Sequence, residues 1–329
     1  CDSAIAVAMA MTSRDSRLSS IPGWPWVTPS HMAGTPPATC AAPPAARLSP
    51  ETYQARIARA VAYTHAGDCF QANISQRFDF ALEPGAHPYT HATRLMAQSR
   101  APFSAYLRLP GLALVSNSPE RFLRVRPDAE GQLIATTEPI KGTRPRGATP
   151  EEDARLAAEL QASEKDLAEN LMIVDLMRND LSRVSTPGSV RVPRLQALET
   201  YANVHHLVST IEARLAPAKD GFDVIRAAFP GGSVTGAPKI RAMQIISELE
   251  DEARGPYCGS LVWMTPDGWM ESSILIRTAA HEETADGGWH GHFRSGGGVV
   301  ADSDPGAEYA ETLDKARALT NALAAPKEA

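Results

Sequence analysis

The stretch FSAYLRLPGLALVSNSPERFLRVRPDAEGQLIATT, residues 103–137, contains four runs typical of β-strands: Phe103–Leu109, Leu112–Ser116, Phe122–Val125 and Leu133–Thr136. Short turns that carry Pro or Gly join these runs, and such turns favour antiparallel pairing. The strands follow one another with no helical pattern between them. This order predicts an α+β fold with antiparallel sheets rather than a doubly wound parallel sheet.

Further elements are expected on either side of this stretch. Ser49 suits a helix cap and Pro50 a first helical position, so order is expected to begin near residue 48. Residues 1–47 are rich in Ala, Pro, Ser and Thr and predict a disordered tail or linker, which leaves residues 48–325 as one domain. We expect strands over Phe70–Phe80 and His205–Leu215, and helices over His91–Gln98, Pro150–Val184 and Pro305–Ala324.

The composition of the 329-residue chain narrows its class. Hydrophobic residues make up 43%, which suffices for a core, and the net charge of −6 argues against binding to nucleic acid or to anionic membranes. The four cysteines form no Cys-x-x-Cys pair, and no apolar run is long enough to span a bilayer. We therefore expect a cytoplasmic protein, with locally basic surroundings wherever an anionic substrate binds.

One lysine stands out directly after the fourth strand-like run. The segment TEPIKGTRPRG, residues 137–147, predicts a shaped loop that leaves the sheet, and Lys141 lies within it beside Gly and Thr. A lysine that loses solvation has a lowered pKa and can act as a nucleophile. Most lysines in loops stay solvated, so this segment alone leaves both interpretations open.

Two carboxylates share one face of the long predicted helix. Asp166 and Glu169 lie on a stripe with apolar residues, in a half of the helix that is apolar nearly all round. A buried carboxylate needs a cationic partner, a proton or a bound cation. Arg178 and Arg183 are candidate partners, so an ion pair and a metal site are both open at this point.

The last predicted helix repeats this arrangement with Glu308, Glu311 and Lys315 on one face. The common interpretation of such a face is a solvated surface with one Glu–Lys pair. If the two helices face each other, however, their four carboxylates make an oxygen-rich site of the kind that Mg²⁺ prefers.

Two glycine-rich segments and two polar residues complete the candidate set. The segment PGGSVTGAPK, residues 230–239, leads into a predicted helix, and its backbone N–H groups together with Thr235 suit an anion. In SGGG, residues 295–298, missing side chains let a ligand approach the backbone. Arg277 ends an apolar run and needs a partner, whereas His206 fits either a core position or a hydrogen-bonding role.

Together these segments resemble the chorismate-utilising enzymes, and within them the large subunits of the aminodeoxychorismate synthase family. The resemblance extends from Leu48 to Leu323. It rests on ordered blocks: GDCFQAN (67–73), PIKGT (139–143), AENLM (168–172), RND (178–180), VHHLVST (204–210), FPGG (229–232), PK (238–239), GGG (296–298) and the helix from Glu308 to Lys315.

The resemblance implies a fold and a set of roles. The fold is a layered sandwich of large antiparallel sheets flanked by helices, and we expect the N-terminal half of the family fold to be missing here. Mg²⁺ would be bound by Glu169 and Glu311, with Asp166 and Glu308 in support. The chorismate carboxylates would be held by Tyr257, Arg277, Lys315 and the backbone at Gly296 and Gly298, while His206 and Thr235 would line the ring side.

Lys141 distinguishes members of the family from one another. Aminodeoxychorismate synthases of this type carry Lys at this position, whereas anthranilate synthases usually carry Ala. The resemblance implies that Lys141 adds to carbon 2 of the ring as the carbon 4 hydroxyl leaves, and that ammonia then enters at carbon 4 and expels the lysine. The product would be 4-amino-4-deoxychorismate, on the way to 4-aminobenzoate and folate. Ammonia would come from a glutamine amidotransferase subunit in a heterodimer.

One departure from the pattern and two alternatives accompany this interpretation. Glu138 stands where many of these synthases have Arg. A glutamate at this position is similar to the pattern of the isochorismate- and salicylate-forming relatives. Those relatives usually lack a lysine at the position of Lys141 and carry one at the position of Gln71, so we favour amination. The alternatives are anthranilate synthase component I, which serves tryptophan synthesis, and a non-catalytic protein that only holds chorismate or the amidotransferase.

Overall fold

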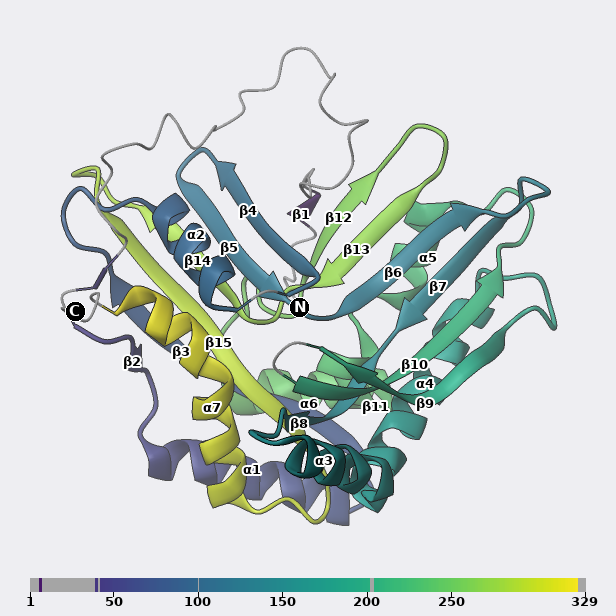
Figure 1. Ribbon diagram of the computed structural model, residues 1–329, viewed down its shortest axis with the longest axis horizontal. Coiled ribbons are helices and arrows are strands. Elements are labelled where there is room, and N and C mark those ends of the chain that lie inside the picture. Colours follow the sequence, from purple (N-terminus) through teal and green to yellow (C-terminus); the bar gives the residue numbers. More distant parts are fainter. Residues whose placement is uncertain (1–5, 8–38, 41, 100, 202–203, 325–329) are drawn as a thin grey trace.

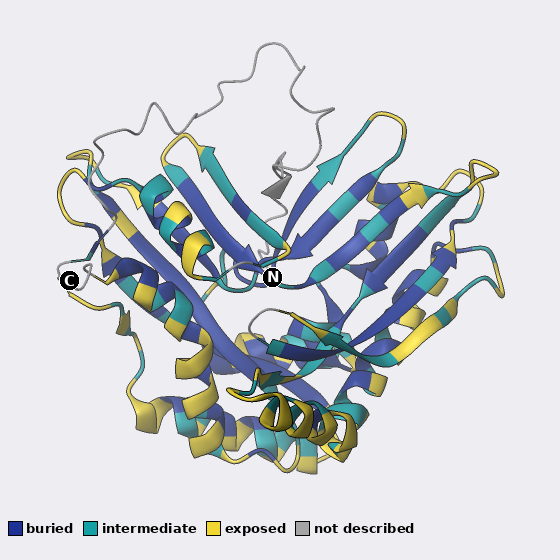
Figure 2. Cartoon of the chain, viewed as in Figure 1, coloured by how far each residue is buried: buried dark blue, intermediate teal, exposed yellow. Residues whose placement is uncertain are grey.

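Two large β-sheets form the centre of the protein, and helices cover their outer faces (Figure 1). The computed structural model describes residues 6–7, 39–40, 42–99, 101–201 and 204–324. In Figure 2 the buried residues follow the strands, while the exposed ones lie on the outer helices and the loop tips. The arrangement confirms the predicted α+β fold of large antiparallel sheets flanked by helices.

The first sheet has the strand order β1-β12-β13-β6-β7-β10-β8, and β9 also pairs with β10. All its described pairs are antiparallel except that between β1 and β12. Helices α4 (Glu164–Ser182) and α5 (Gly221–Ala228) pack on it and share an apolar core with it. The strands are β1 (Ala6–Val7), β6 (Arg121–Pro127), β7 (Leu133–Glu138), β8 (Ile140–Pro145), β9 (Arg191–Thr200), β10 (Val204–Arg214), β12 (Ser260–Met264) and β13 (Met270–Ile274).

The second sheet has the order β11-β3-β15-β14-β5-β4, and β2 pairs with β3. Helices α2 (Pro88–Gln98) and α7 (Pro305–Leu323) cover one part of it, and α1 (Pro50–His65) and α6 (Lys239–Glu250) pack near β3. The strands are β2 (Ala45–Ala46), β3 (Gln71–Ala81), β4 (Phe103–Leu109), β5 (Leu112–Ser118), β11 (Gly236–Ala237), β14 (Thr278–Glu283) and β15 (Trp289–Val299).

The four strand-like runs of residues 103–137 do not form one continuous meander, contrary to the sequence interpretation. The first two pair as β4 and β5 in the second sheet, and the last two pair as β6 and β7 in the first. Pro119 follows β5 and has no backbone N–H to donate, so a ladder cannot continue through it. The chain therefore changes sheets at Pro119–Glu120.

A second crossing lies directly beside this one. Between β13 and β14 the chain returns from the first sheet to the second through residues 275–277. The backbone N–H of Asn117 donates to the carbonyl of Arg277 at 3.0 Å, and that of Ile274 donates to the carbonyl of Glu120 at 3.2 Å. The first of these bonds extends the pairing of β5 with β14 and the second extends that of β6 with β13, so the two crossings lie side by side.

The long helix predicted over Pro150–Val184 is two helices, α3 (Pro150–Ala162) and α4. Ser163 has extended backbone angles, and its hydroxyl accepts a hydrogen bond from the N–H of Asp166 at 3.3 Å. It ends one helix and caps the next, which is the usual role of serine at such a position.

Most of the segment 1–47 lies outside the described residues, so the predicted tail stays a prediction. Parts of it that are described join the sheets: β1 pairs with β12, β2 pairs with β3, and Cys40 forms a bridge to Leu82. Of the helices in the described ranges, none combines the length and apolar character that crossing a bilayer requires.

Candidate active site

A cavity of about 920 Å³ lies among strands of both sheets, α4 and α7. All the predicted site residues line it except Thr235: Lys141, Asp166, Glu169, His206, Tyr257, Arg277, Gly296, Gly298, Glu308, Glu311 and Lys315. Residues from distant parts of the sequence therefore meet around one space, although their individual roles stay predictions.

Lys141 lies in strand β8 and not in the predicted loop. The pairing register between β8 and β10 shifts at Lys141–Gly142, which makes this point a β-bulge. Gly142 has a φ of 85°, a left-handed conformation that side-chain-bearing residues rarely adopt. Bulges redirect side chains, and this one accompanies the turn of Lys141 into the cavity.

The Lys141 amine faces polar groups. Its Nζ lies 3.3 Å from Oε1 of Gln71 and 3.6 Å from Oε2 of Glu169, and its side chain is 12% exposed. The amide nitrogen of Gln71 is buried and has no hydrogen-bond partner among the described residues. A hydrogen-bond donor without a partner, Nε2 of Gln71, therefore lies beside the amine. This arrangement is expected where a polar ligand binds.

Each predicted metal-binding carboxylate of α4 has a basic partner, but not the one considered from the sequence. Glu169 faces Lys141, and Asp166 pairs with Arg144 at 3.2 Å. Arg178 instead pairs with Asp175 on the surface of the same helix. Both carboxylates thus form ion pairs, as one of the two interpretations expected, but with Lys141 and Arg144 rather than with Arg178 or Arg183.

The carboxylates of α7 meet over Gly297. A Cβ atom at Gly297 would stand 3.0 Å from Oε2 of Glu308, 3.7 Å from Oε1 of Glu311 and 3.7 Å from Nζ of Lys315. The Lys315 amine also lies 2.6 Å from Glu311. Absence of a side chain at residue 297 thus leaves room for two carboxylates and one cation.

The charges of both helices act on these two glutamates. Burial raises the pKa of Glu308, and the nearby charge of Glu311 adds to the effect. Burial also opposes ionisation of Glu311, but the charges of Lys315, Lys165 and Lys141 together hold its pKa below the usual value. Lys165 belongs to α4, and Lys141 contacts Glu169 of the same helix. Because the charges of both lysines act on Glu311 of α7, α4 and α7 face each other across the cavity.

This donor set fits a hard divalent cation in its chemistry. All four groups are carboxylates, which Mg²⁺ prefers, and Glu311 of the α7 pair already contacts the Lys315 ammonium at 2.6 Å. Within the described ranges no three acidic, histidine or cysteine side chains are close enough together to hold a metal as they stand. The basic partners would have to give way for the four to share one ion.

Arg277 and Glu120 lie at the two crossings between the sheets. Arg277 has a φ of 50°, and its side chain makes no hydrogen bond or ion pair with the described residues. Burial lowers its pKa, and the charge of Glu120 opposes that change. A largely buried guanidinium without a paired carboxylate suits an anionic ligand.

Glu120 is a site residue that the sequence analysis missed. It lines the cavity, is 5% exposed and interacts with Ser233 and with the charges of Lys141 and Arg277. Burial raises its pKa to about 7, against the opposing effect of these neighbours. Its local sequence, the polar residues 116–118 and Pro119 before it and Arg121 after it, resembles an ordinary turn.

The remaining predicted residues differ in their access to the cavity. Burial and then the charge of Arg277 lower the pKa of His206 to about 4, so its ring is neutral near pH 7, and it contacts Oγ1 of Thr143 at 2.8 Å. Tyr257 is 8% exposed, and burial raises the pKa of its hydroxyl well above the usual value. Thr235 is absent from the lining formed by the described residues and donates its hydroxyl to the Gly231 carbonyl at 2.9 Å.

Glu138, the residue that departs from the amination pattern, pairs with Arg121 at 2.5 Å. Arg121 also binds Glu271 on β13 at 2.7 Å, so Glu138 takes part in an ion-pair group across three strands. It is not among the described residues that line the cavity. Its position favours a structural role over that of an acid in the site.

Comparison with known proteins agrees with the fold and with the cavity. The sequence pattern of the family described as chorismate binding enzyme matches residues 9–321. The chain belongs to this family. Aminodeoxychorismate synthase component 1 of Klebsiella aerogenes is 49% identical over 280 residues, which are 84% of this chain. Anthranilate synthase component 1 of a Synechocystis strain is 43% identical over a similar share.

A solved structure agrees at the level of the whole fold. The crystal structure of anthranilate synthase component I from Streptococcus pneumoniae matches with a TM-score of 0.74 and 33% identity over 86% of this chain. The chain spans 59% of the Klebsiella protein, 54% of the Synechocystis protein and 60% of the crystallised one. It thus covers less than two thirds of each of these three relatives.

Proposed function

We propose that the protein aminates chorismate with ammonia to give 4-amino-4-deoxychorismate. The observation that carries the proposal is the meeting of a lysine amine, a buried acid and an unpaired guanidinium in one cavity, from Lys141, Glu120 and Arg277. The 49% identity to an aminodeoxychorismate synthase component 1 supports the same reaction.

The two carboxylates of chorismate require positive charge. Arg277 and Lys315 would supply it, together with the hydroxyl of Tyr257 and the backbone at Gly296 and Gly298. The neutral ring of His206 would contact the substrate ring without adding charge. The orphan amide nitrogen of Gln71 would donate to an oxygen of the ligand.

Lys141 and Glu120 would share the chemical step. The Lys141 amine forms a bond to carbon 2 of the ring as the bond between carbon 4 and its hydroxyl breaks. Glu120, protonated in part near pH 7, would give a proton to the leaving hydroxyl so that water departs. Ammonia then bonds to carbon 4 as the lysine leaves carbon 2 as the free amine. One proton of the added nitrogen would return to Glu120, so that the net products are 4-amino-4-deoxychorismate and water.

Mg²⁺ would be held by Glu169 and Glu311, with Asp166 and Glu308 in support. When bound it would neutralise one carboxylate of the substrate. The doubly charged chorismate could then bind beside these four acidic side chains. Binding of Mg²⁺ would also draw Glu169 away from Lys141, which the structure places 3.6 Å apart.

Ammonia would come from a glutamine amidotransferase subunit in a heterodimer, and the product would serve 4-aminobenzoate and folate synthesis. The name component 1 of the Klebsiella relative agrees with a two-subunit enzyme. An ammonium salt can replace that partner in a test.

The test is incubation of the chain with chorismate, Mg²⁺ and an ammonium salt. We expect a product that retains the enolpyruvyl group and yields 4-aminobenzoate only when a lyase is added. Fluorescent anthranilate with release of pyruvate, formed without a lyase, would refute the proposal. It would favour anthranilate synthase component I, the alternative supported by the relatives at 43% and 33% identity. Binding of chorismate without turnover would favour the non-catalytic alternative.

A further inference from the structure

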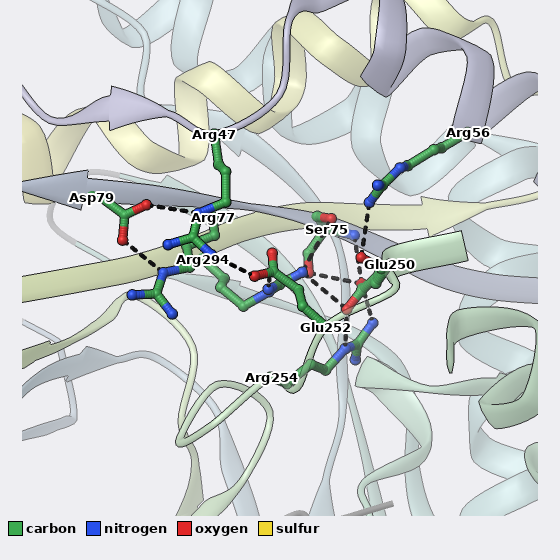
Figure 3. A network of polar contacts seen from close by, with 9 residues as sticks. All are labelled: Arg47, Arg56, Ser75, Arg77, Asp79, Glu250, Glu252, Arg254 and Arg294. Atoms are coloured by element: carbon green, nitrogen blue, oxygen red, sulfur yellow. Dashed lines mark hydrogen bonds and ion pairs between the residues drawn. The ribbon is translucent and has the colours of Figure 1, made fainter. Parts of the chain in front are cut away.

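A group of buried charges centred on one carboxylate lies beside the cavity, and one member, Arg294, is part of the cavity lining. Figure 3 shows how the group meets. Its centre is Glu250 at the end of α6, whose side chain is 1% exposed. Arg294 on β15 is equally buried, and the side chain of Arg254, four residues after Glu250, is 13% exposed. None of these three residues has a role in the proposed reaction.

The Glu250 carboxylate is fully occupied by donors. Its Oε1 accepts from the N–H and the hydroxyl of Ser75, each at 2.8 Å, and from Arg254 at 2.7 Å. Its Oε2 accepts from Nε of Arg254 at 2.9 Å and from Arg294 at 3.1 Å. The bidentate contact fixes the plane of the Arg254 guanidinium.

The other edge of that guanidinium reaches the cavity wall. Arg254 donates to the carbonyl of Val234 at 3.0 Å and to that of Asn73 at 2.6 Å, and both of these residues line the cavity. Its guanidinium carbon also lies 5.5 Å from the ring centre of Tyr257. One side chain therefore joins β3, the segment 231–235 and Tyr257.

We infer that Arg254 is a positioning residue, held by Glu250, that sets Tyr257 and the backbone at Asn73 and Val234 in place for the substrate. The inference rests on the proposed function. Stability alone does not explain the arrangement, because a buried ion pair often contributes no more than apolar residues of the same volume. What a fixed guanidinium adds is a defined distance between three wall segments.

The test compares Arg254→Lys with Arg56→Lys in the full chain. Lysine keeps the charge that Glu250 faces but loses the fork that joins Glu250 to two carbonyls. Arg56 is the matched control, because it donates at 3.0 Å to the backbone carbonyl of the same Glu250 but belongs to α1 and is not part of the cavity lining.

We expect Arg254→Lys to lower kcat/KM for chorismate by about 10²-fold, mainly through KM, since small displacements of positioning groups have effects of this size. The KM for ammonium should change by less than about threefold, as expected when only one substrate loses its contacts. Arg56→Lys should match the wild type in both. A wild-type KM for chorismate in Arg254→Lys, or equal losses in the two variants, would overturn the inference.

Two further measurements cover the other outcomes. If Arg254→Lys does not fold, the double variant Glu250→Gln/Arg254→Gln takes its place. It removes both charges and leaves Arg294 paired with Glu252 at 2.8 Å. This double variant should show the same rise in KM for chorismate. If the wild type does not turn chorismate over, the proposed function fails, and calorimetric Kd values for chorismate then test the positioning role alone. An equal Kd in wild type and variant, or no binding by the wild type, would refute that role.

Discussion

Replacement of Glu120 by Gln should stabilise the protein at alkaline pH while it slows the reaction. The folded protein raises the pKa of this carboxyl from 4.5 to about 7, chiefly by burial. Between these values the folded state binds more protons than the unfolded state, so the free energy of unfolding falls as pH rises. This contribution is fully present below pH 4.5 and is lost as pH rises through about 7. Each unit of pKa corresponds to about 1.4 kcal/mol, which makes the full loss about 3 kcal/mol.

The assay is urea unfolding of wild type and Glu120→Gln at pH 5 and at pH 8. Glutamine has nearly the same shape and does not ionise, so the variant lacks this one pH-dependent term. The advantage of the variant should therefore grow by about 2 to 3 kcal/mol between the two pH values. Glu130→Gln, at an exposed turn position, serves as the control and should show a constant difference.

A constant difference between wild type and Glu120→Gln across this pH range would refute the reasoning, because it would mean that Glu120 ionises normally in the folded protein. The same variant should aminate chorismate about 10² to 10⁴ times more slowly, the range over which general acids contribute. The wild-type rate should fall as pH rises through about 7, and the variant should lose that fall.

Three other perturbations test separate parts of the site. Lys141→Ala should lower the amination rate by at least about 10³-fold with an unchanged circular dichroism spectrum, and an unchanged rate would exclude the nucleophilic role. Gly142→Ala and Gly188→Ala both place a Cβ at a positive φ, but only the Cβ at residue 142 would lie 2.9 Å from Leu160. Gly142→Ala should therefore lower the free energy of unfolding in urea by roughly 1 to 3 kcal/mol more than Gly188→Ala does. Equal losses in the two variants would contradict the packing argument. Removal of divalent ions by a chelator should abolish turnover and Mg²⁺ should restore it, at higher concentration for Glu311→Gln; full activity in the chelator would rule out the metal.

Local sequence patterns predicted the elements of the fold well, since each depends on residues close together in the chain. Ser49 and Pro50 correctly indicated the start of α1, and apolar patterns correctly indicated α2, α7, β3 and β10, with bounds shifted by a few residues. Ser163 was missed as a helix boundary because its neighbours on both sides favour helix, and only its cap hydrogen bond marks the break.

Spacing on helices also predicted part of the site. Residues three apart share a helix face whatever lies opposite, so Asp166 with Glu169 and Glu308 with Glu311 could be paired from the sequence. Which cations they meet depends on tertiary structure. The contact between Lys141 and Glu169 needs the bulge in β8. That bulge forms only when β8 pairs with β10, and the paired residues on either side of it are more than 60 positions apart in the sequence.

Glu120 could not be assigned from the sequence because its importance depends on where two strands end. Had β5 and β6 paired in one sheet, Pro119–Glu120 would be a tight turn with a solvated carboxylate. Because the strands belong to different sheets, the connection instead passes between them, beside the return crossing that carries Arg277. Residues of both crossings line the cavity there, and Glu120 is buried without becoming part of the apolar core. Because two such crossings lie together, one with an acid and one with a guanidinium, both groups of the proposed reaction lie where the chain passes between the sheets rather than on either sheet face.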